Sequence, residues 1–201
     1  MKQLVLASNN PGKVREIRAL VAPLAIEIVP QAELGIAEAE EPHATFLENA
    51  LAKARHASRT AGLPALADDS GLCVEALACE PGVHSAYFAG THGSREERDA
   101  RNNAKLLSVL EGCAQRRAHY ICVMVMLRSA DDPEPVVAQG HWLGSIALAP
   151  RGAGGFGYDP LFLLPGRGLT AAELAAEEKN RISHRGQALA RLLAQLREGP
   201  A

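Results

Sequence analysis

Two adjacent carboxylates, Asp68 and Asp69, follow an apolar run that begins at Leu63 and lead into Ser70 and Gly71. Carboxylates at a strand end supply the hard oxygen ligands that suit Mg²⁺, which also takes ligands from water and substrate phosphate. A buried aspartate could also take a proton from water where burial or a like charge raises its pKa. The same residues make a good turn, so a purely structural role stays open.

A second acidic segment, which contains Glu38, Glu40 and Glu41, could supply further metal ligands. Glu40 and Glu41 are adjacent, so the residue types do not decide which of them would serve a metal. A solvated surface loop would have the same composition.

A possible phosphate site lies where an apolar stretch at 3–7 meets a helical pattern. Its residues are Ser8, Asn9, Asn10, Pro11, Gly12 and Lys13. Free backbone N–H groups at a helix start favour an anion, and Lys13 adds a full positive charge. The P-loop pattern does not fit, because Ala7 and Val14 stand where it needs Gly and Ser or Thr. An ordinary strand-to-helix turn would also use Asn, Pro and Gly.

A glycine-rich segment near residue 155 could recognise a planar base. It contains Phe156, Gly157, Tyr158 and Asp159. An aromatic ring can face a base while glycine lets the backbone approach its edge. A flexible surface loop is the alternative.

The segment from Lys179 to Arg185 joins two helical patterns, and Ser183 can cap the second of them. His184 and Arg185 then fall in a first helical turn, where cations oppose the helix dipole. This placement favours a role in binding an anionic or carbonyl-bearing ligand.

Short apolar runs alternate with helical patterns, which predicts an α/β protein with a mixed sheet. Capping-box patterns at 45–48, 94–97 and 170–173 predict three helix starts. The first helix should end at Gly62 and the second, whose charge density indicates a solvated face, at Gly112. The last helix carries an apolar stripe of Leu189, Leu192, Leu193 and Leu196.

Further strands are expected at 25–29, 120–127 and 136–148. The last two runs are separated by 131–135 and predict a long antiparallel hairpin, which could form a second lobe. Length, together with the lack of a convincing linker, predicts a single domain over residues 1–201.

Composition excludes several classes of protein. A net charge of −2 and a pI near 6.4 lack the basic excess of a nucleic-acid binder. We expect no membrane partner, since no apolar run reaches membrane-spanning length, and the absence of a signal-peptide pattern predicts a cytoplasmic protein. The four cysteines form no C-x-x-C pair and are expected to be reduced thiols.

Taken together, five short motifs resemble the Ham1/RdgB-type family of inosine triphosphate pyrophosphatases. In family order they are Ser8-x-Asn10-x-x-Lys13, the acidic pair before Thr45-Phe46-x-Glu48-Asn49-Ala50, Asp68-Asp69-Ser70-Gly71, Phe156-Gly157-Tyr158-Asp159 and Lys179-x-x-x-Ser183-His184-Arg185. The resemblance covers almost the whole chain. It implies an elongated mixed β-sheet flanked by helices, two lobes around a nucleotide-binding cleft, a homodimer and Mg²⁺ dependence.

The resemblance also implies a role for each motif. In the first motif, Ser8, Asn10 and Lys13 would bind the triphosphate. Lys53 would reach it from the helix that begins with the capping box at 45–48. Glu41 and Asp69 would hold Mg²⁺, with Asp69 also the general base and Ser70 a substrate contact. The base and sugar would be bound by Phe156, Gly157, Tyr158, Asp159, Lys179, His184 and Arg185.

The implied reaction is attack of water on the α-phosphorus of a non-standard purine nucleoside triphosphate, which releases pyrophosphate. A donor from His184, Arg185 or a loop N–H would pair with the purine 6-oxo group. The alternatives are a pyrophosphatase for modified pyrimidine nucleotides and a nucleotide sensor without turnover. A phosphatase with an aspartyl nucleophile fits less well, because the Asp-x-Asp spacing is missing.

Overall fold

The computed structural model describes residues 3–22 and 26–198. Its α-helices are α1 (Pro11–Val21), α2 (Phe46–Ala61), α3 (Arg95–Val109), α4 (Ala176–Ile182) and α5 (His184–Glu198). Its strands are β1 (Gln3–Leu6), β2 (Glu27–Pro30), β3 (Ala65–Val74), β4 (Arg117–Leu127), β5 (Val136–Ile146) and β6 (Phe162–Leu163). Short 3₁₀ helices lie at η2 (Gln31–Leu34), η3 (Glu75–Leu77), η4 (Gly82–Tyr87) and η5 (Ala171–Glu173).

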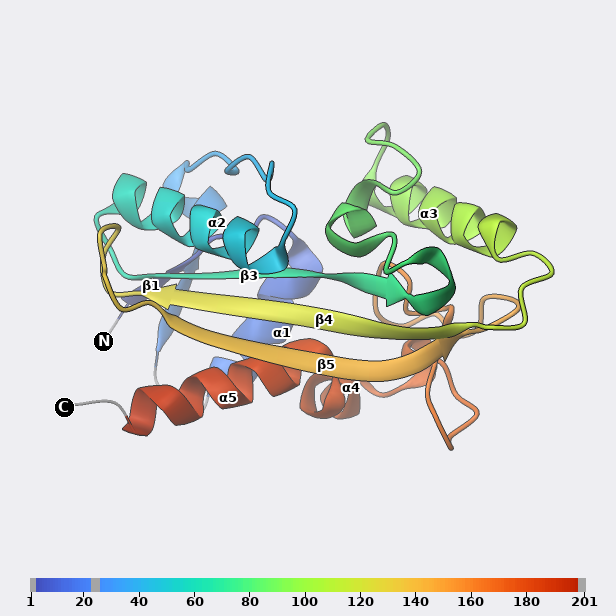
Figure 1. Ribbon diagram of the computed structural model, residues 1–201. Coiled ribbons are helices and arrows are strands. Elements are labelled where there is room, and N and C mark those ends of the chain that lie inside the picture. The colour runs from blue at the N-terminus through green and yellow to red at the C-terminus, as the bar shows by residue number, and fades with distance from the viewer. Residues whose placement is uncertain (1–2, 23–25, 199–201) are drawn as a thin grey trace. The chain divides into compact units, whose positions relative to one another are not determined.

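The six strands form one mixed sheet in the order β2-β1-β3-β4-β5-β6 (Figure 1). Strand β1 is parallel to both β2 and β3, whereas β6 is antiparallel to β5. Parallel neighbours need a crossover, which α1 supplies between β1 and β2. The predicted α/β class with a mixed sheet and flanking helices is therefore confirmed.

The chain divides into two compact units. Unit 1 consists of the described residues within 1–69, 122–140 and 184–201, and unit 2 of residues 70–121 and 141–183. The predicted β4–β5 hairpin does not form a lobe of its own, because its tip at 122–140 belongs to unit 1. Each of the two strands has residues in both units. The apolar runs in the sequence did not indicate this division.

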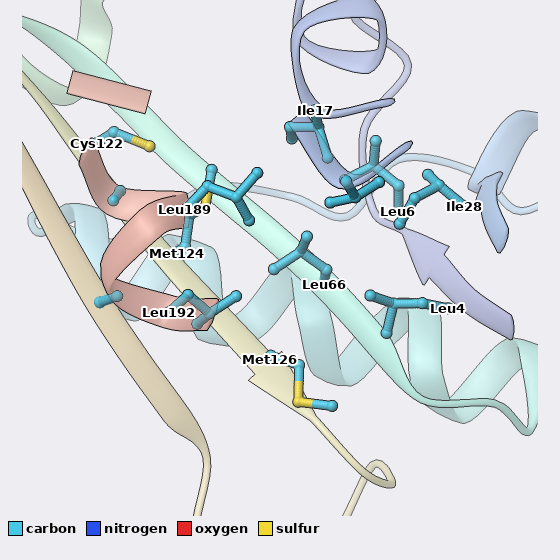
Figure 2. Packing of buried hydrophobic residues seen from close by; sticks show 13 residues of the cluster. Leu4, Leu6, Ile17, Ile28, Leu66, Cys122, Met124, Met126, Leu189 and Leu192 are labelled. Atoms are coloured by element: carbon cyan, nitrogen blue, oxygen red, sulfur yellow. The ribbon is translucent and has the colours of Figure 1, made fainter. Parts of the chain in front are cut away.

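Unit 1 has a core of aliphatic and sulfur-containing side chains (Figure 2). Leu6 of β1 and Leu66 of β3 pack with Ile17 of α1, Met124 of β4 and Leu189 of α5. Of the expected apolar stripe of the last helix, Leu189 and Leu192 are core residues and Leu193 packs against the core, whereas Leu196 is exposed. Burial of such side chains stabilises by roughly 1.5–3 kcal/mol each.

Unit 2 has a separate core that is richer in aromatic residues. The rings of Tyr120, Trp142 and Phe162 lie together, with Phe162 at 4.6 Å from Tyr120 and 5.2 Å from Trp142 between ring centroids. Leu106 and Leu110 contribute from α3 and its C-terminal cap. This core supports the sheet end that carries β6.

The predicted helix starts are confirmed, with two differences in extent. The Thr45 side chain accepts a hydrogen bond from the Glu48 N–H at the start of α2, which ends at Ala61 with Gly62 as its C-terminal cap. The box at 94–97 is complete, but α3 ends at Val109 and not at Gly112. The box at 170–173 begins only the three-residue η5.

The second predicted strand is β2, which begins at Glu27; Ala25, at the start of the expected range, lies outside the described residues. None of the helices in the described ranges has the length and apolar character needed to cross a bilayer.

Candidate active site

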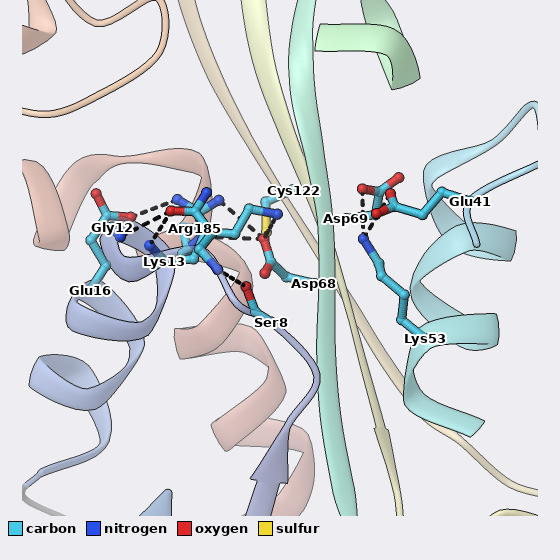
Figure 3. A network of polar contacts seen from close by, with 11 residues as sticks. Ser8, Gly12, Lys13, Glu16, Glu41, Lys53, Asp68, Asp69, Cys122 and Arg185 are labelled. Carbon is cyan, nitrogen blue, oxygen red and sulfur yellow. Dashed lines mark hydrogen bonds and ion pairs between the residues drawn. The ribbon is translucent and has the colours of Figure 1, made fainter. Parts of the chain in front are cut away.

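The two aspartates lie within a strand and not at its end. Strand β3 continues through Asp68, Asp69, Ser70 and Gly71 to Val74, so the predicted turn at these residues is wrong. Side chains alternate across a strand, and the adjacent carboxylates therefore point to opposite faces. Figure 3 shows Asp68 toward α1 and α5, and Asp69 toward α2.

On the first face, Asp68 accepts contacts from two cations. Its Oδ2 lies 3.0 Å from Nζ of Lys13 and 3.1 Å from Nη2 of Arg185. Arg185 also reaches Glu16, with 2.6 Å between Nη1 and Oε2. Burial alone would raise the pKa of Asp68, but Lys13 and Arg185 hold it well below its usual range. Asp68 is therefore a permanent anion that fixes these cations.

On the second face, Lys53 joins two carboxylates. Its Nζ lies 3.0 Å from Oδ1 of Asp69 and 3.1 Å from Oε2 of Glu41. Burial alone would lower the pKa of Lys53, but Asp69 and Glu41 keep it above its ordinary value. Burial raises the pKa of Asp69 despite Lys53, and Glu41 adds to the increase. A buried carboxylate with a raised pKa suits a general base.

The carboxylates of this second face fit a magnesium ion. Oδ2 of Asp69 is buried without a hydrogen-bond partner in the described chain, and Glu41 shares Lys53 with it. No group of three or more His, Cys, Asp or Glu residues that could hold a metal occurs in residues 3–22 and 26–198. Mg²⁺ usually binds through one or two carboxylates plus waters and substrate phosphates, and two carboxylates suffice for that mode.

The start of α1 is more fully satisfied than expected. Asn10 caps the helix, and its Oδ1 accepts hydrogen bonds from the N–H groups of Gly12 and Lys13. Ser8 Oγ accepts one from Asn10 N–H. The predicted free N–H groups are therefore engaged by the protein, and phosphate contacts at this turn would fall to side chains, chiefly those of Ser8 and Lys13.

Asn9 and Pro11 of the same turn are exposed. Proline has no N–H to offer, although its position at the first turn of α1 suits its fixed φ. Of the six predicted phosphate contacts, Lys13 alone brings a full charge.

In unit 2, the predicted base-binding loop is tied down by an ion pair. Asp159 Oδ2 pairs with Nζ of Lys179 and accepts the Phe156 N–H at 2.9 Å. The Lys179 ammonium also lies 4.7 Å from the centroid of the Phe156 ring, a cation–π distance. The structure thus brings Phe156, Asp159 and Lys179 together.

Tyr158 has a different place from the one expected. Its ring belongs to the unit 2 core, and its hydroxyl donates to the Ser85 carbonyl at 2.9 Å. Burial raises its pKa. We therefore assign the Tyr158 side chain to anchoring the loop, and leave contact with a ligand to the Phe156 ring.

The remaining predicted residues lie at the edges of these groups. Ser70 is half-buried and follows Asp69 directly on β3. Ser183 has an extended backbone between α4 and α5, and His184 is a buried residue in the first turn of α5, as expected.

Three residues that contact the predicted site residues were missed. Glu16 resembled any polar residue of an amphipathic helix, yet it is buried against Arg185. Asp99 and Asn103 were assigned to a solvated face of α3, yet both bind the backbone of Gly157. Their spacing of four residues, which places them on one helix face, was the available signal.

The fold is that of an α/β protein with a mixed sheet, and its strand β3 carries one ion-paired cluster on each face. The chain belongs to the Ham1 family, whose model matches residues 4–195. It is 63% identical over 197 residues to the dITP/XTP pyrophosphatase of Ralstonia nicotianae, with 98% of each chain covered. It is 60% identical to that of Nitrosomonas europaea, with 98% of this chain and 96% of the relative covered.

Solved structures agree. A HAM1 protein from Coxiella burnetii superposes with a TM-score of 0.89 at 46% identity, covering 99% of this chain and 100% of the other. The Staphylococcus aureus Ham1 protein gives a TM-score of 0.85 at 38% identity, covering 98% and 99%.

Proposed function

We propose that this protein is an enzyme that hydrolyses inosine, deoxyinosine and xanthosine triphosphates to the nucleoside monophosphate and pyrophosphate. It would remove non-standard purine nucleotides from the nucleotide pool. The observation that carries the proposal is the buried, unpartnered Oδ2 of Asp69 beside Lys53 and Glu41. The names of the curated relatives, dITP/XTP pyrophosphatase, support the substrate class.

In this proposal Asp69 orients or deprotonates the water that attacks the α-phosphorus. Lys13 and Lys53 offset the negative charge that develops on the leaving pyrophosphate, and Ser8 and Asn10 contact the triphosphate. Asp69 and Glu41 would hold Mg²⁺, which when bound would neutralise phosphate charge and orient the phosphates.

Base selectivity would rest on the purine 6-position. The Arg185 guanidinium is bound to Asp68 and Glu16, and the N–H groups of Phe156 and Gly157 donate to carboxylates. In this proposal the donor to the 6-oxo group comes from His184, Arg185 or a loop N–H. Adenine offers a donor there instead, and an unsatisfied buried group costs about 1–3 kcal/mol.

We further propose that the protein works in the cytoplasm as a homodimer of single-domain chains spanning residues 1–201, with Mg²⁺ as its cofactor. Sedimentation at micromolar concentration tests the dimer.

The first test is incubation of the purified protein with Mg²⁺ and either inosine triphosphate or ATP, with products read by chromatography and phosphorus NMR. We expect inosine monophosphate plus pyrophosphate, with ATP largely spared. Release of orthophosphate and a nucleoside diphosphate would move the attack to the γ-phosphorus and overturn the mechanism. Binding without any product would identify a nucleotide sensor.

Glu41 and Glu40 offer a matched pair for the metal assignment. The Glu41 side chain reaches Lys53, the residue that also binds Asp69. We expect Glu41→Gln to raise the Mg²⁺ concentration for half-maximal activity by roughly tenfold or more, because losing even a residue that only supports a metal ligand costs about 10–100-fold in metal affinity. Glu40→Gln should leave the magnesium titration unchanged. The reverse result would move the ligand by one residue.

A further inference from the structure

One face of helix α3 contacts the loop that carries Phe156. The three residues concerned, Arg95, Asp99 and Asn103, are spaced four apart and therefore lie on one side of the helix. Asp99 Oδ2 accepts the Gly157 N–H at 2.8 Å, and Asn103 Nδ2 donates to the Gly157 carbonyl, also at 2.8 Å. Both backbone groups of one loop residue are thus bound by a single helix.

The backbone conformation of Gly157 suits glycine. Its φ of +64° lies in the left-handed region, which glycine adopts readily. The Asn103 amide is held in the orientation required, because its Nδ2 also donates to the Asp99 carbonyl at 2.7 Å. The two hydrogen bonds hold the peptide groups on either side of Gly157. They thereby restrict the backbone at the residue that directly follows Phe156.

Arg95 contacts the aromatic ring of the same loop. Its guanidinium carbon lies 5.4 Å from the Phe156 ring centroid, within the range of a cation–π contact. Arg95 is the first residue of α3, where a cation opposes the helix dipole. Local helix energetics therefore disfavour arginine at this position, whereas the contact with Phe156 gives it a role.

Packing alone does not hold the loop. A cavity of about 570 Å³ lies between α3 and the glycine-rich segment, and Phe156 and Gly157 are part of its lining. Ala100, Leu107 and Pro150 line it as well. The loop borders an open pocket on this side, and its hydrogen bonds to α3 contribute to holding it in place.

We propose that Arg95, Asp99 and Asn103 are positioning residues that hold the Phe156 ring in the geometry needed to bind the purine base. The inference rests on the proposed function. It assigns to α3 a part in base binding, although none of the three residues needs to touch the base. Without the contacts from Arg95, Asp99 and Asn103 the loop is less ordered, and substrate binding must then supply the free energy to order it.

The test measures KM and kcat for inosine triphosphate and for ATP in Asp99→Ala and Asn103→Ala. Each variant should raise KM for inosine triphosphate roughly tenfold, because one net hydrogen bond corresponds to about that factor. Its kcat should change by less than ~3-fold, the pattern of lost ground-state binding. KM for ATP should rise in parallel, because the Phe156 ring can face any purine. Asp99→Asn, which keeps an acceptor for the Gly157 N–H, should restore most of the loss.

Arg98→Ala is the matched control. Arg98 is the neighbour of Asp99 on α3, but it donates to the Gly93 carbonyl and lies over the Tyr87 ring. We expect it to leave KM for inosine triphosphate near wild type. If Asp99→Ala and Asn103→Ala change stability alone, or if Arg98→Ala raises KM equally, the positioning role is wrong. A wild-type protein that releases no pyrophosphate would instead refute the proposed function.

Discussion

Asp69→Asn should abolish most of the turnover of inosine triphosphate while leaving the protein folded. Asparagine keeps the size of the side chain and an oxygen for Lys53 Nζ, which now lies 3.0 Å from Asp69 Oδ1. It removes the negative charge and the proton acceptor. Loss of a general base costs roughly 10²–10⁴ in rate, and a weakened metal site adds to that loss.

The measurement is kcat at saturating substrate across a magnesium titration, with circular dichroism to check the fold. If high Mg²⁺ restores the rate, Asp69 acts through the metal and not as a base. A kcat close to wild type at ordinary magnesium would remove Asp69 from the mechanism. Asp68→Asn is an informative comparison, because Asp68 points to the opposite face of β3 and pairs with Lys13 and Arg185. It should lower stability and act on turnover only through the position of Lys13, without changing the magnesium titration.

Local signals in the sequence predicted local structure well. The Thr45 and Ser94 caps and the apolar stripe of the last helix depend on residues within two turns of one another, so their outcome needs no knowledge of the rest of the chain. The motif residues Lys13, Lys53 and Asp69 likewise stand out by type.

The strand through Asp68 and Asp69 could not be predicted in the same way. Asp-Asp-Ser-Gly has the composition of a turn, and local preference favours one. The tertiary structure overrides that preference, because Lys13 and Arg185 pair with one carboxylate and Lys53 with the other. Partners so far apart in sequence become visible only once the sheet is built.

Glu16 and Asp99 illustrate the same limit. Each is a charged residue on a helix, and most such residues are solvated. Their partners, Arg185 and the Gly157 N–H, are 169 and 58 residues away. Spacing along a helix shows which residues share a face, but it does not show what that face meets.

Arg185→Ala should strongly destabilise the protein. The sequence alone suggested the opposite, because removing a cation from a helix start relieves an unfavourable interaction with the dipole, worth about 0.3–1 kcal/mol. The structure places Arg185 at 1% exposure, with hydrogen bonds to both Asp68 and Glu16. Removing one partner of a buried ion pair costs about 3–5 kcal/mol, because the other charge is left uncompensated, and this outweighs the dipole.

The matched control is Arg18→Ala, also in unit 1. Arg18 pairs with Glu33 at 2.9 Å, but both side chains are about half exposed, and an exposed pair is worth about 0–1 kcal/mol. Urea unfolding of both variants gives the comparison. Equal, small losses would mean that Lys13 alone can compensate Asp68 and that Glu16 finds solvent. A large loss confined to Arg185→Ala would show that this arginine stabilises the fold in the absence of substrate. KM for that variant must then be measured under conditions where the protein is still folded. Only a change in KM under those conditions can be attributed to base recognition.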